Sequence, residues 1–426
     1  MNRKLTTAAC IAALLALNVW ILARLFRTEY SPFMGSIQGA YVGISRWLLS
    51  NWSHPGWFPL WYGGIPAENT YPPLLHFLVA FASMATGWSV AHAHHAVTAA
   101  FYCLGPVALF WLVWRLTRSQ WKAFVAGWIY SLVSPSAFLI RSVRGDMGTV
   151  WGARKLQALV EYGEGPHIAS ITLMLVALAA VHAALESEAA WPTVLAVLAV
   201  SAGVLTNWLG ALALVCGVLA LMIARKEART GRVVLIGVLA YAIAAPWIPP
   251  SDIADVQRNA QQVLSFPMGT FQYLYLAAWL AAAVWIGSAL RKKTPLTEGS
   301  RFAIVFLFFM AVPPLAYEYL HVYPLPQPAR YHLEMDAAFA IVAGVALGSG
   351  RVLSRYKWSR VVVAAVLVGL AVMQAPLADA GARPTAGVRH HKDRGADAGP
   401  LAGEPLSGAT CVCHREHAVL VKRLCG

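Results

Sequence analysis

Charged residues are scarce in this chain of 426 residues. Only 12% of its residues are Asp, Glu, Lys or Arg, whereas soluble domains carry roughly 25%. Hydrophobic residues make up 58% of the chain, against roughly 45–50% in soluble domains, and they fall in long continuous blocks. This composition excludes a soluble globular protein. The blocks also differ from the short alternating segments of an outer-membrane barrel, so the sequence predicts a polytopic helical membrane protein.

Several motifs that carry chemistry are missing as well. The sequence has no Gly-rich phosphate loop, no nucleophile elbow and no His-Glu-x-x-His pattern. Cys411 and Cys413 lack the spacing of haem attachment, and the cluster of His92, His94 and His95 fits no standard ligand pattern and suits a loop beside a span. We therefore expect no bound metal and no cofactor.

The apolar blocks have the length of membrane-crossing helices. We predict an all-α polytopic membrane protein with about eleven transmembrane helices in residues 1–376. The predicted spans are about 5–26, 96–114, 123–140, 167–185, 191–206, 208–224, 233–248, 270–290, 302–317, 335–350 and 361–376. Residues 73–87 are expected to form a short interfacial or re-entrant helix, and 377–426 a disordered or truncated outside tail.

Basic residues outnumber acidic ones, giving a net charge of +14. They stand mostly in short loops, where they orient a protein in the bilayer, so nucleic acid is not an expected partner. Loops 225–232, 291–301 and 351–360 are strongly basic and are predicted to be cytoplasmic, like the N-terminus. Alternating crossings place all three loops on the cytoplasmic side only if Asn207 marks an outside turn between two helices. We expect a bacterial inner-membrane protein whose active face lies outside.

The first outside loop, residues 27–72, is long enough to be functional. Ser31-Pro32 is predicted to begin an amphipathic helix lying along the membrane surface. A stretch rich in Pro, Gly and aromatic residues follows. Its aromatic side chains, including those of Trp57, Trp61 and Tyr62, either anchor at headgroup level or stack on sugar rings.

Glu29 stands three residues beyond the first predicted span, at the boundary between water and lipid. A carboxylate there is expected to be partly desolvated and suited to accept a proton from an alcohol. The alternative is a structural acid that caps a helix or pairs with Arg24 or Arg27.

These features resemble a known family. A first span, an acid directly after it, a surface helix, and a loop containing Trp61-Tyr62-Gly63-Gly64 and ending in Tyr71-Pro72-Pro73-Leu74 are similar to the GT-C superfamily of membrane glycosyltransferases. The likeness is strongest to bacterial membrane proteins labelled 6-pyruvoyl-tetrahydropterin-synthase-related. It covers residues 1–140 by motif and the remainder by architecture.

The resemblance implies a GT-C-like bundle that transfers a sugar from a polyprenyl-phosphate donor to an acceptor outside the membrane, with inversion at the anomeric carbon. Glu29 occupies the place of the family's general base. The family more often has Asp there, and this chain has no Asp-x-Asp pair, which puts a required metal in doubt.

Further polar residues on the predicted outer face are candidates for binding substrate. Glu164 and His167 open a span, where polar groups usually face protein. Segment 141–166 forms either a second wall of the active-site cavity or a solvated surface helix. Arg330 and His332 follow a proline-rich turn and are expected to grip the donor phosphate, unless the arginine only contacts lipid headgroups. The expected substrate-binding residues are Trp57, Trp61, Tyr62, Glu68, Tyr71, Glu164, His167, Arg330 and His332.

Two other classes of protein stay open. A flippase or transporter of lipid-linked saccharides would place charged groups or broken helices near mid-membrane. A non-catalytic protein of envelope biogenesis would need no cavity behind Glu29. The predicted spans carry little charge at their centres, which favours chemistry at one face.

Overall fold

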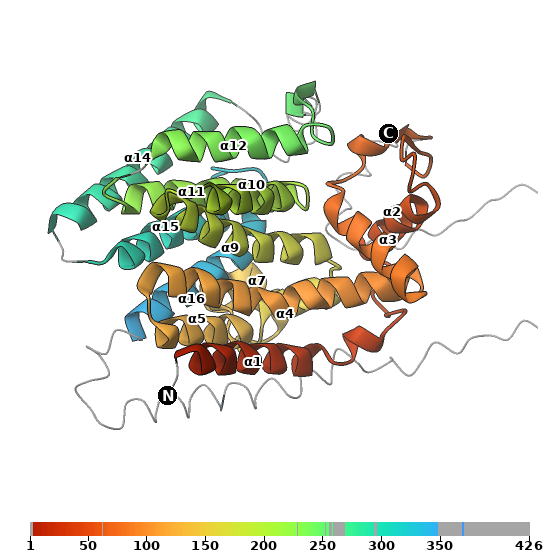
Figure 1. Cartoon of the computed structure of the whole chain (residues 1–426), viewed down its shortest axis with the longest axis horizontal. Coiled ribbons are helices and arrows are strands. Elements are labelled where there is room, and N and C mark those ends of the chain that lie inside the picture. Colours follow the sequence, from red (N-terminus) through yellow and green to blue (C-terminus); the bar gives the residue numbers. More distant parts are fainter. Residues whose placement is uncertain are drawn as a thin grey trace, which may run out of the picture. The chain divides into compact units, whose positions relative to one another are not determined.

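The computed structural model describes residues 3–347, apart from residues 62, 228, 252, 255–257, 259–268, 294 and 295, and also residue 369. The described part consists of helices and one two-stranded hairpin (Figure 1). The fold is therefore that of an all-α polytopic membrane protein, as the composition predicted.

The apolar blocks form helices. Their bounds are α1 Arg3–Leu22, α4 Val90–Thr117, α5 Gln120–Leu132, α9 Gly165–Glu186, α10 Ala190–Val204, α11 Trp208–Ala224, α12 Thr230–Ala244, α14 Thr270–Lys293, α15 Glu298–Leu320 and α16 His332–Leu347. Each predicted span within the described residues overlaps one of these helices, with 123–140 as the exception described below, and the span 361–376 lies outside those residues. By length and apolar composition, five of the described helices suffice to cross a membrane: α1, α4, α9, α14 and α15.

One predicted span is interrupted. The block 123–140 contains α5 and the short α6, Pro135–Leu139, separated by Val133 and Ser134 in extended conformation. Proline disfavours helical backbone in the residue before it, so Pro135 ends α5 one turn early and starts α6. The prediction of one continuous span here was wrong.

α9 is the most enclosed of the long helices. It packs against α4, α10 and α11, and small residues allow this close approach. A Cβ atom on Gly217 of α11 would lie 2.8 Å from Leu178 Cδ1 on α9, and one on Gly105 of α4 would lie 3.1 Å from Thr172 Oγ1. The position of α9 matters because its first residues carry two of the candidate site residues.

The first loop is folded against the bundle. The loop contains α2 Gln38–Ser50, β1 Trp57–Phe58, β2 Ile65–Pro66 and η2 Ala67–Asn69, and it is flanked by η1 Leu25–Arg27 and α3 Leu74–Thr86. The predicted apolar face of α2 is buried, at Tyr41, Ile44 and Leu48, and α2 packs against α3. The predicted helix start at Ser31-Pro32 was wrong, because the Ser31 hydroxyl accepts a hydrogen bond from the Phe33 amide and fixes a turn there.

α3 occupies the segment that was expected not to cross the membrane. With 13 residues, it is roughly 20 Å long at 1.5 Å per residue, well short of 30 Å of hydrocarbon. The Leu74 amide at its start donates to the Leu205 carbonyl, 2.9 Å away, between α10 and α11. This bond docks the end of the first loop onto the turn that contains Asn207. As predicted, the chain breaks between two helices at that residue.

Basic loops gather at one end of the bundle. Arg115 and Arg118, at the end of α4, both pair with Glu186 at 2.7 Å, and Arg225 pairs with Glu298 at 2.9 Å. We call this the basic end, and the end with the first residues of α9 and α16 the site end. The predicted cytoplasmic loops within the described residues thus share one end, and 351–360 lies outside those residues.

Candidate functional site

Two ion pairs join α9 to the segment before and within α16. Glu164 Oε1 lies 3.0 Å from the Arg330 guanidinium, and His167 Nε2 lies 2.7 Å from Glu334 Oε1. Gly163 has a φ of +68°, a left-handed conformation that glycine adopts readily, and it turns the chain into α9. Pro166 stands in the first turn of α9. Arg330 lies in η3, Pro328–Tyr331, directly before α16.

The pair of His167 and Glu334 is enclosed. Their side chains are 2% and 0% exposed, and Glu334 Oε2 has no hydrogen-bond partner within the described structure. Glu334 stands in the first turn of α16, where the helix dipole favours an acid. Its carboxylate also contacts an imidazole 167 residues away along the chain, which its position in the sequence does not reveal. Buried polar groups with an unmet hydrogen bond destabilise a fold, so such a pair indicates a functional constraint.

The Glu164–Arg330 pair is more open than its neighbour. The Arg330 side chain is 46% exposed and that of Glu164 is 14% exposed. Glu164 Oε2 has no hydrogen-bond partner in the described part of the chain. A half-buried carboxylate therefore holds the guanidinium while nearly half of the Arg330 side chain stays accessible.

Two tyrosines adjoin this pair. Tyr41 on α2 donates a hydrogen bond to the Tyr71 hydroxyl at 3.3 Å, and the Asn207 side-chain amide donates to the same hydroxyl at 2.7 Å. Burial raises the pKa of Tyr71 to about 12, and the charges of Glu164 and Arg330 act on it in opposite directions. Burial also raises the pKa of Tyr41. Both phenols therefore stay protonated at neutral pH.

Arg154, on the short helix α8 Arg154–Val160, centres a second polar cluster. Its guanidinium bonds to Asp146 at the end of α7, Arg141–Met147, and donates to His332 Nε2 at 3.3 Å. Burial alone would raise the pKa of Asp146, but the Tyr162 hydroxyl and Arg154 outweigh it and hold the pKa below its usual range. His332 Nδ1 bonds to the Ala329 carbonyl at 2.7 Å. Both ring nitrogens of His332 are thus engaged.

Lys155 lies deeper in the protein. Its side chain is 4% exposed, and its ammonium lies 4.2 Å and 4.0 Å from the ring centroids of Tyr102 and Tyr130. The amine has no hydrogen-bond partner within the described residues. Burial lowers the pKa of Lys155 to about 7. Since Arg154 is buried as well, the interpretation of 141–166 as a solvated surface helix is wrong for this part.

Glu29 follows η1, and its position is set by two histidines of α4. His92 Nε2 bonds to the Phe26 carbonyl, and His95 Nδ1 bonds to the Thr28 carbonyl, each at 2.9 Å. These histidines stand in the first turns of α4 and not in a loop, which corrects the sequence interpretation. The Glu29 side chain is exposed, so the protein itself does not provide the partial desolvation that was expected.

His94 connects the Glu29 segment with the start of α9. Its ring centroid lies 6.1 Å from that of His95 and 6.4 Å from that of Tyr41. A Cβ atom on Gly165 would lie 3.6 Å from His94 Nε2. The rings of His95, His94 and Tyr41 thus form a row that begins at the Thr28 carbonyl and passes the backbone of Gly165.

The other predicted substrate residues stand around the hairpin. Trp57 is 58% exposed, and a Cβ atom on Gly64 would lie 2.4 Å from its indole nitrogen. The Trp61 ring meets Phe58 edge to face at 5.5 Å. Glu68 is half-buried in η2, and Tyr62 lies outside the described residues.

The described residues contain no group of three or more His, Cys, Asp or Glu side chains arranged to hold a metal ion. The expectation that the protein needs no metal stays a prediction. The sequence analysis did not single out Tyr41, Arg154, Lys155 or Glu334 as site residues, although segment 141–166, offered as a second wall of the cavity, contains Arg154 and Lys155. The sequence signal available for each of them was its position, because each is a polar residue that stands at the start of a helix or within an apolar stripe.

No family model matches the chain, and no curated protein does. Among solved structures, the apo form of the oligosaccharyltransferase from Archaeoglobus fulgidus is similar, with a TM-score of 0.51 and 14% sequence identity over 89% of this chain and 56% of that one. Oligosaccharyltransferase AglB of the same organism, in complex with an inhibitory peptide and a dolichol-phosphate, gives 0.49 and 13% with the same coverage.

The chain thus spans little more than half the length of these oligosaccharyltransferases. At 14% identity the apo-form likeness shows the fold alone, and it confirms the predicted all-α polytopic membrane fold. Membership of the GT-C superfamily stays a prediction. The narrower resemblance to pterin-synthase-related membrane proteins stays a prediction.

Proposed function

We propose that this protein is a membrane glycosyltransferase that moves a sugar from a polyprenyl-phosphate-linked donor to an acceptor at the site end. The observation that carries the proposal is the half-exposed Arg330 guanidinium, held by Glu164 and flanked by protonated Tyr41 and Tyr71. In a GT-C-like bundle, this arrangement suits an anionic leaving group at the membrane surface. We propose that the site end faces the outside of a bacterial inner membrane.

Arg330 would hold the donor phosphate. Its planar guanidinium matches phosphate oxygens in a bidentate manner, and such charge-assisted bonds are stronger than neutral ones. Glu164 keeps the guanidinium oriented before the donor arrives. The Tyr71 hydroxyl already accepts bonds from Tyr41 and Asn207. Its own proton is then free for a phosphate oxygen.

Glu29 would act as the general base. The oxygen of an acceptor hydroxyl attacks the anomeric carbon on the face opposite to the phosphate, and Glu29 takes the hydroxyl proton. The bond between the anomeric carbon and the phosphate oxygen breaks, and its electron pair leaves with the phosphate, where Arg330 stabilises the charge. The configuration of the anomeric carbon is inverted.

His92 and His95 would position the base by holding the backbone on its N-terminal side. His332, with both ring nitrogens engaged, would orient Arg154 and not bind phosphate itself. The exposed Trp57 indole and the Trp61 and Tyr62 positions would line the acceptor groove, because aromatic faces stack on sugar rings.

The test uses the full chain in proteoliposomes with a panel of radiolabelled polyprenyl-phosphate sugars and a membrane extract as the acceptor source. Release of polyprenyl phosphate reports transfer. Glu29→Gln should lower the rate by about 10²–10⁴-fold, the usual contribution of a general base. Glu186→Gln, at the basic end, is the matched control and should retain the wild-type rate. Full activity of Glu29→Gln, or donor that crosses the bilayer without being cleaved, would overturn the proposal.

A further inference from the structure

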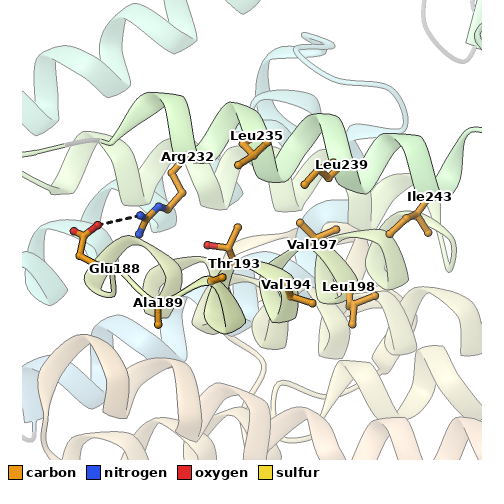
Figure 2. A pocket seen from close by; sticks show the side chains of 11 residues that line it. Glu188, Ala189, Thr193, Val194, Val197, Leu198, Arg232, Leu235, Leu239 and Ile243 are labelled. Carbon is orange, nitrogen blue, oxygen red and sulfur yellow. Dashed lines mark hydrogen bonds and ion pairs between the residues drawn. The ribbon is translucent and has the colours of Figure 1, made fainter.

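A groove runs between α10 and α12, away from the candidate site. Its volume is about 450 Å³. Figure 2 shows Val194 and Leu198 of α10 along one side and Leu235, Leu239 and Ile243 of α12 along the other. Val194 and Leu198 are 56% and 55% exposed. Apolar side chains exposed on a membrane-spanning bundle face lipid, so the groove has the lining of a site for a hydrocarbon chain.

The charged residues that line the groove lie at one end, near the start of both helices. There the Arg232 guanidinium lies 3.2 Å from Glu188, as the dashed line in Figure 2 marks. Arg229 lies 2.6 Å from the same carboxylate. Two guanidinium groups thus share one carboxylate, and that carboxylate is 76% exposed. This end therefore carries an excess of positive charge.

Arg229 has capacity left to bind an anion. Its Nη1 atom is buried and has no hydrogen-bond partner within the described residues. Its backbone has a φ of +43°, which is unfavourable for a bulky residue. Arg232, in contrast, donates to the Ala184 and Ser187 carbonyls at the end of α9 as well as to Glu188. Arg229 does not itself line the groove, but it shares Glu188 with Arg232, and both of those residues do. A guanidinium with an unmet donor next to the charged end of an apolar groove fits a ligand that carries both a negative charge and a chain.

We infer that this groove binds an anionic glycerophospholipid. Its phosphate would contact Arg229 and Arg232, and one acyl chain would lie between Val194 and Leu239. From Glu188 to Leu198 the groove follows about ten residues of chain, or roughly 15 Å of helix, which is half of the hydrocarbon thickness and suits one leaflet. The site is distinct from the proposed donor site, because Arg229 lies at the basic end and Arg330 at the site end.

The positive charge at this end of the groove determines whether an anionic or a zwitterionic lipid headgroup binds more tightly. Each Lys or Arg near a membrane surface contributes about 1 kcal/mol of attraction to anionic lipid. A zwitterionic headgroup brings its own cation to an end that already holds two guanidinium groups. The groove should therefore prefer phosphatidylglycerol to phosphatidylcholine.

The test uses the full chain in phosphatidylcholine nanodiscs that contain a minor fraction of phosphatidylglycerol with a photoreactive acyl chain. Crosslinks mapped by mass spectrometry should concentrate in residues 190–198 and 235–243. Unlabelled phosphatidylglycerol should compete, whereas added phosphatidylcholine should not. Arg229→Gln should lower the crosslink yield about fivefold, which corresponds to one arginine contact.

Two further variants keep the test decisive. Arg118→Gln removes a cation from the same end but outside the groove and should leave the yield unchanged. Val194→Trp fills the groove without a change in charge and should lower the yield even if Arg229→Gln folds poorly. Crosslinks spread evenly over all lipid-facing helices, equal competition by phosphatidylcholine, or equal yields for Arg229→Gln and Arg118→Gln would each overturn the inference.

Discussion

The charged side chains at the two ends of the bundle differ in how far they are buried. At the basic end, Glu186 receives two arginines and is still 30% exposed, and Arg301 donates to the Ala224 and Leu296 carbonyls. At the site end, His167 and Glu334 pair with almost no exposure, and the Lys155 ammonium lies against two aromatic rings without a hydrogen-bond partner among the described residues.

This difference in burial separates charged groups that suit the ends of helices from charged groups that are enclosed within the bundle. Half-exposed ion pairs and arginines that bond to the last carbonyls of a helix suit the ordinary needs of helix ends. Both ends hold buried polar atoms with an unmet hydrogen bond among the described residues, such as Arg115 Nε at the basic end and Glu334 Oε2 at the site end. The ends differ in how far the charged groups are enclosed, because Glu334 and Lys155 are almost fully buried whereas Glu186 is not. An enclosed charge destabilises a fold unless it is paired or something binds there, so we expect the larger energetic cost at the site end.

Removing one carboxylate from each end should give the largest contrast. Glu334→Ala leaves a buried imidazole without its partner and should destabilise the protein by about 3–5 kcal/mol. Glu186→Ala breaks only partly exposed pairs and should cost about 0–1 kcal/mol. Urea unfolding of both variants in the same detergent measures the difference. Equal losses at the two ends would remove the distinction drawn here.

The pH dependence of stability should sharpen the contrast. Because the pKa of folded Lys155 is lowered to about 7, the unfolded chain binds more protons between that pH and the ordinary lysine pKa of about 10.4. Stability should therefore rise across this window, by at most about 1.4 kcal/mol per pH unit, and be lowest below pH 7.

Lys155→Met should remove this contribution, whereas Lys122→Met, at the basic end, should keep the wild-type slope. Unfolding midpoints measured from pH 6 to pH 10 report both slopes. A Lys155→Met profile that parallels the wild type would show that the buried amine does not titrate as expected.

A smaller effect is expected where the first loop meets the bundle. Tyr71→Phe removes the hydroxyl that accepts from Asn207 and Tyr41, and it leaves the Asn207 amide without that partner. The loss should be about 1–3 kcal/mol. Tyr241→Phe is a suitable control, because the Tyr241 side chain is exposed and its hydroxyl donates to a carbonyl at 3.2 Å. The melting temperature should fall more for Tyr71→Phe than for Tyr241→Phe. Equal melting temperatures for the two variants would argue against a tight contact between the loop and the bundle.

Local patterns predicted much of the fold. Apolar blocks gave the helices, and the basic loops indicated which helix ends lie together. The break at Asn207 followed from the number of crossings needed to place every basic loop on one side. The Asn207 side chain caps α11 by accepting a hydrogen bond from the Leu209 amide at 2.8 Å. These features depend on residues close in sequence, which a single chain displays directly.

The site was only partly accessible to the same reasoning. Glu164, His167, Arg330 and Tyr71 were expected at the outer surface, and the structure brings them together. The partners that complete the site are far away in sequence: Glu334 contacts His167, which stands 167 residues before it. Tyr41 and Glu334 fitted ordinary helical patterns, and periodicity does not reveal which distant residue will face them.

The most direct test of the account is the affinity of the full chain for a polyprenyl phosphate without sugar, measured by tritium-labelled ligand binding in detergent. Arg330→Gln should weaken binding by about 10–100-fold, since a hydrogen bond to a charged group contributes about 1.5–3 kcal/mol. Arg118→Gln, at the basic end, should bind as the wild type does. If Arg330→Gln and the wild type have the same Kd, the site end does not hold the donor phosphate and the central claim is wrong.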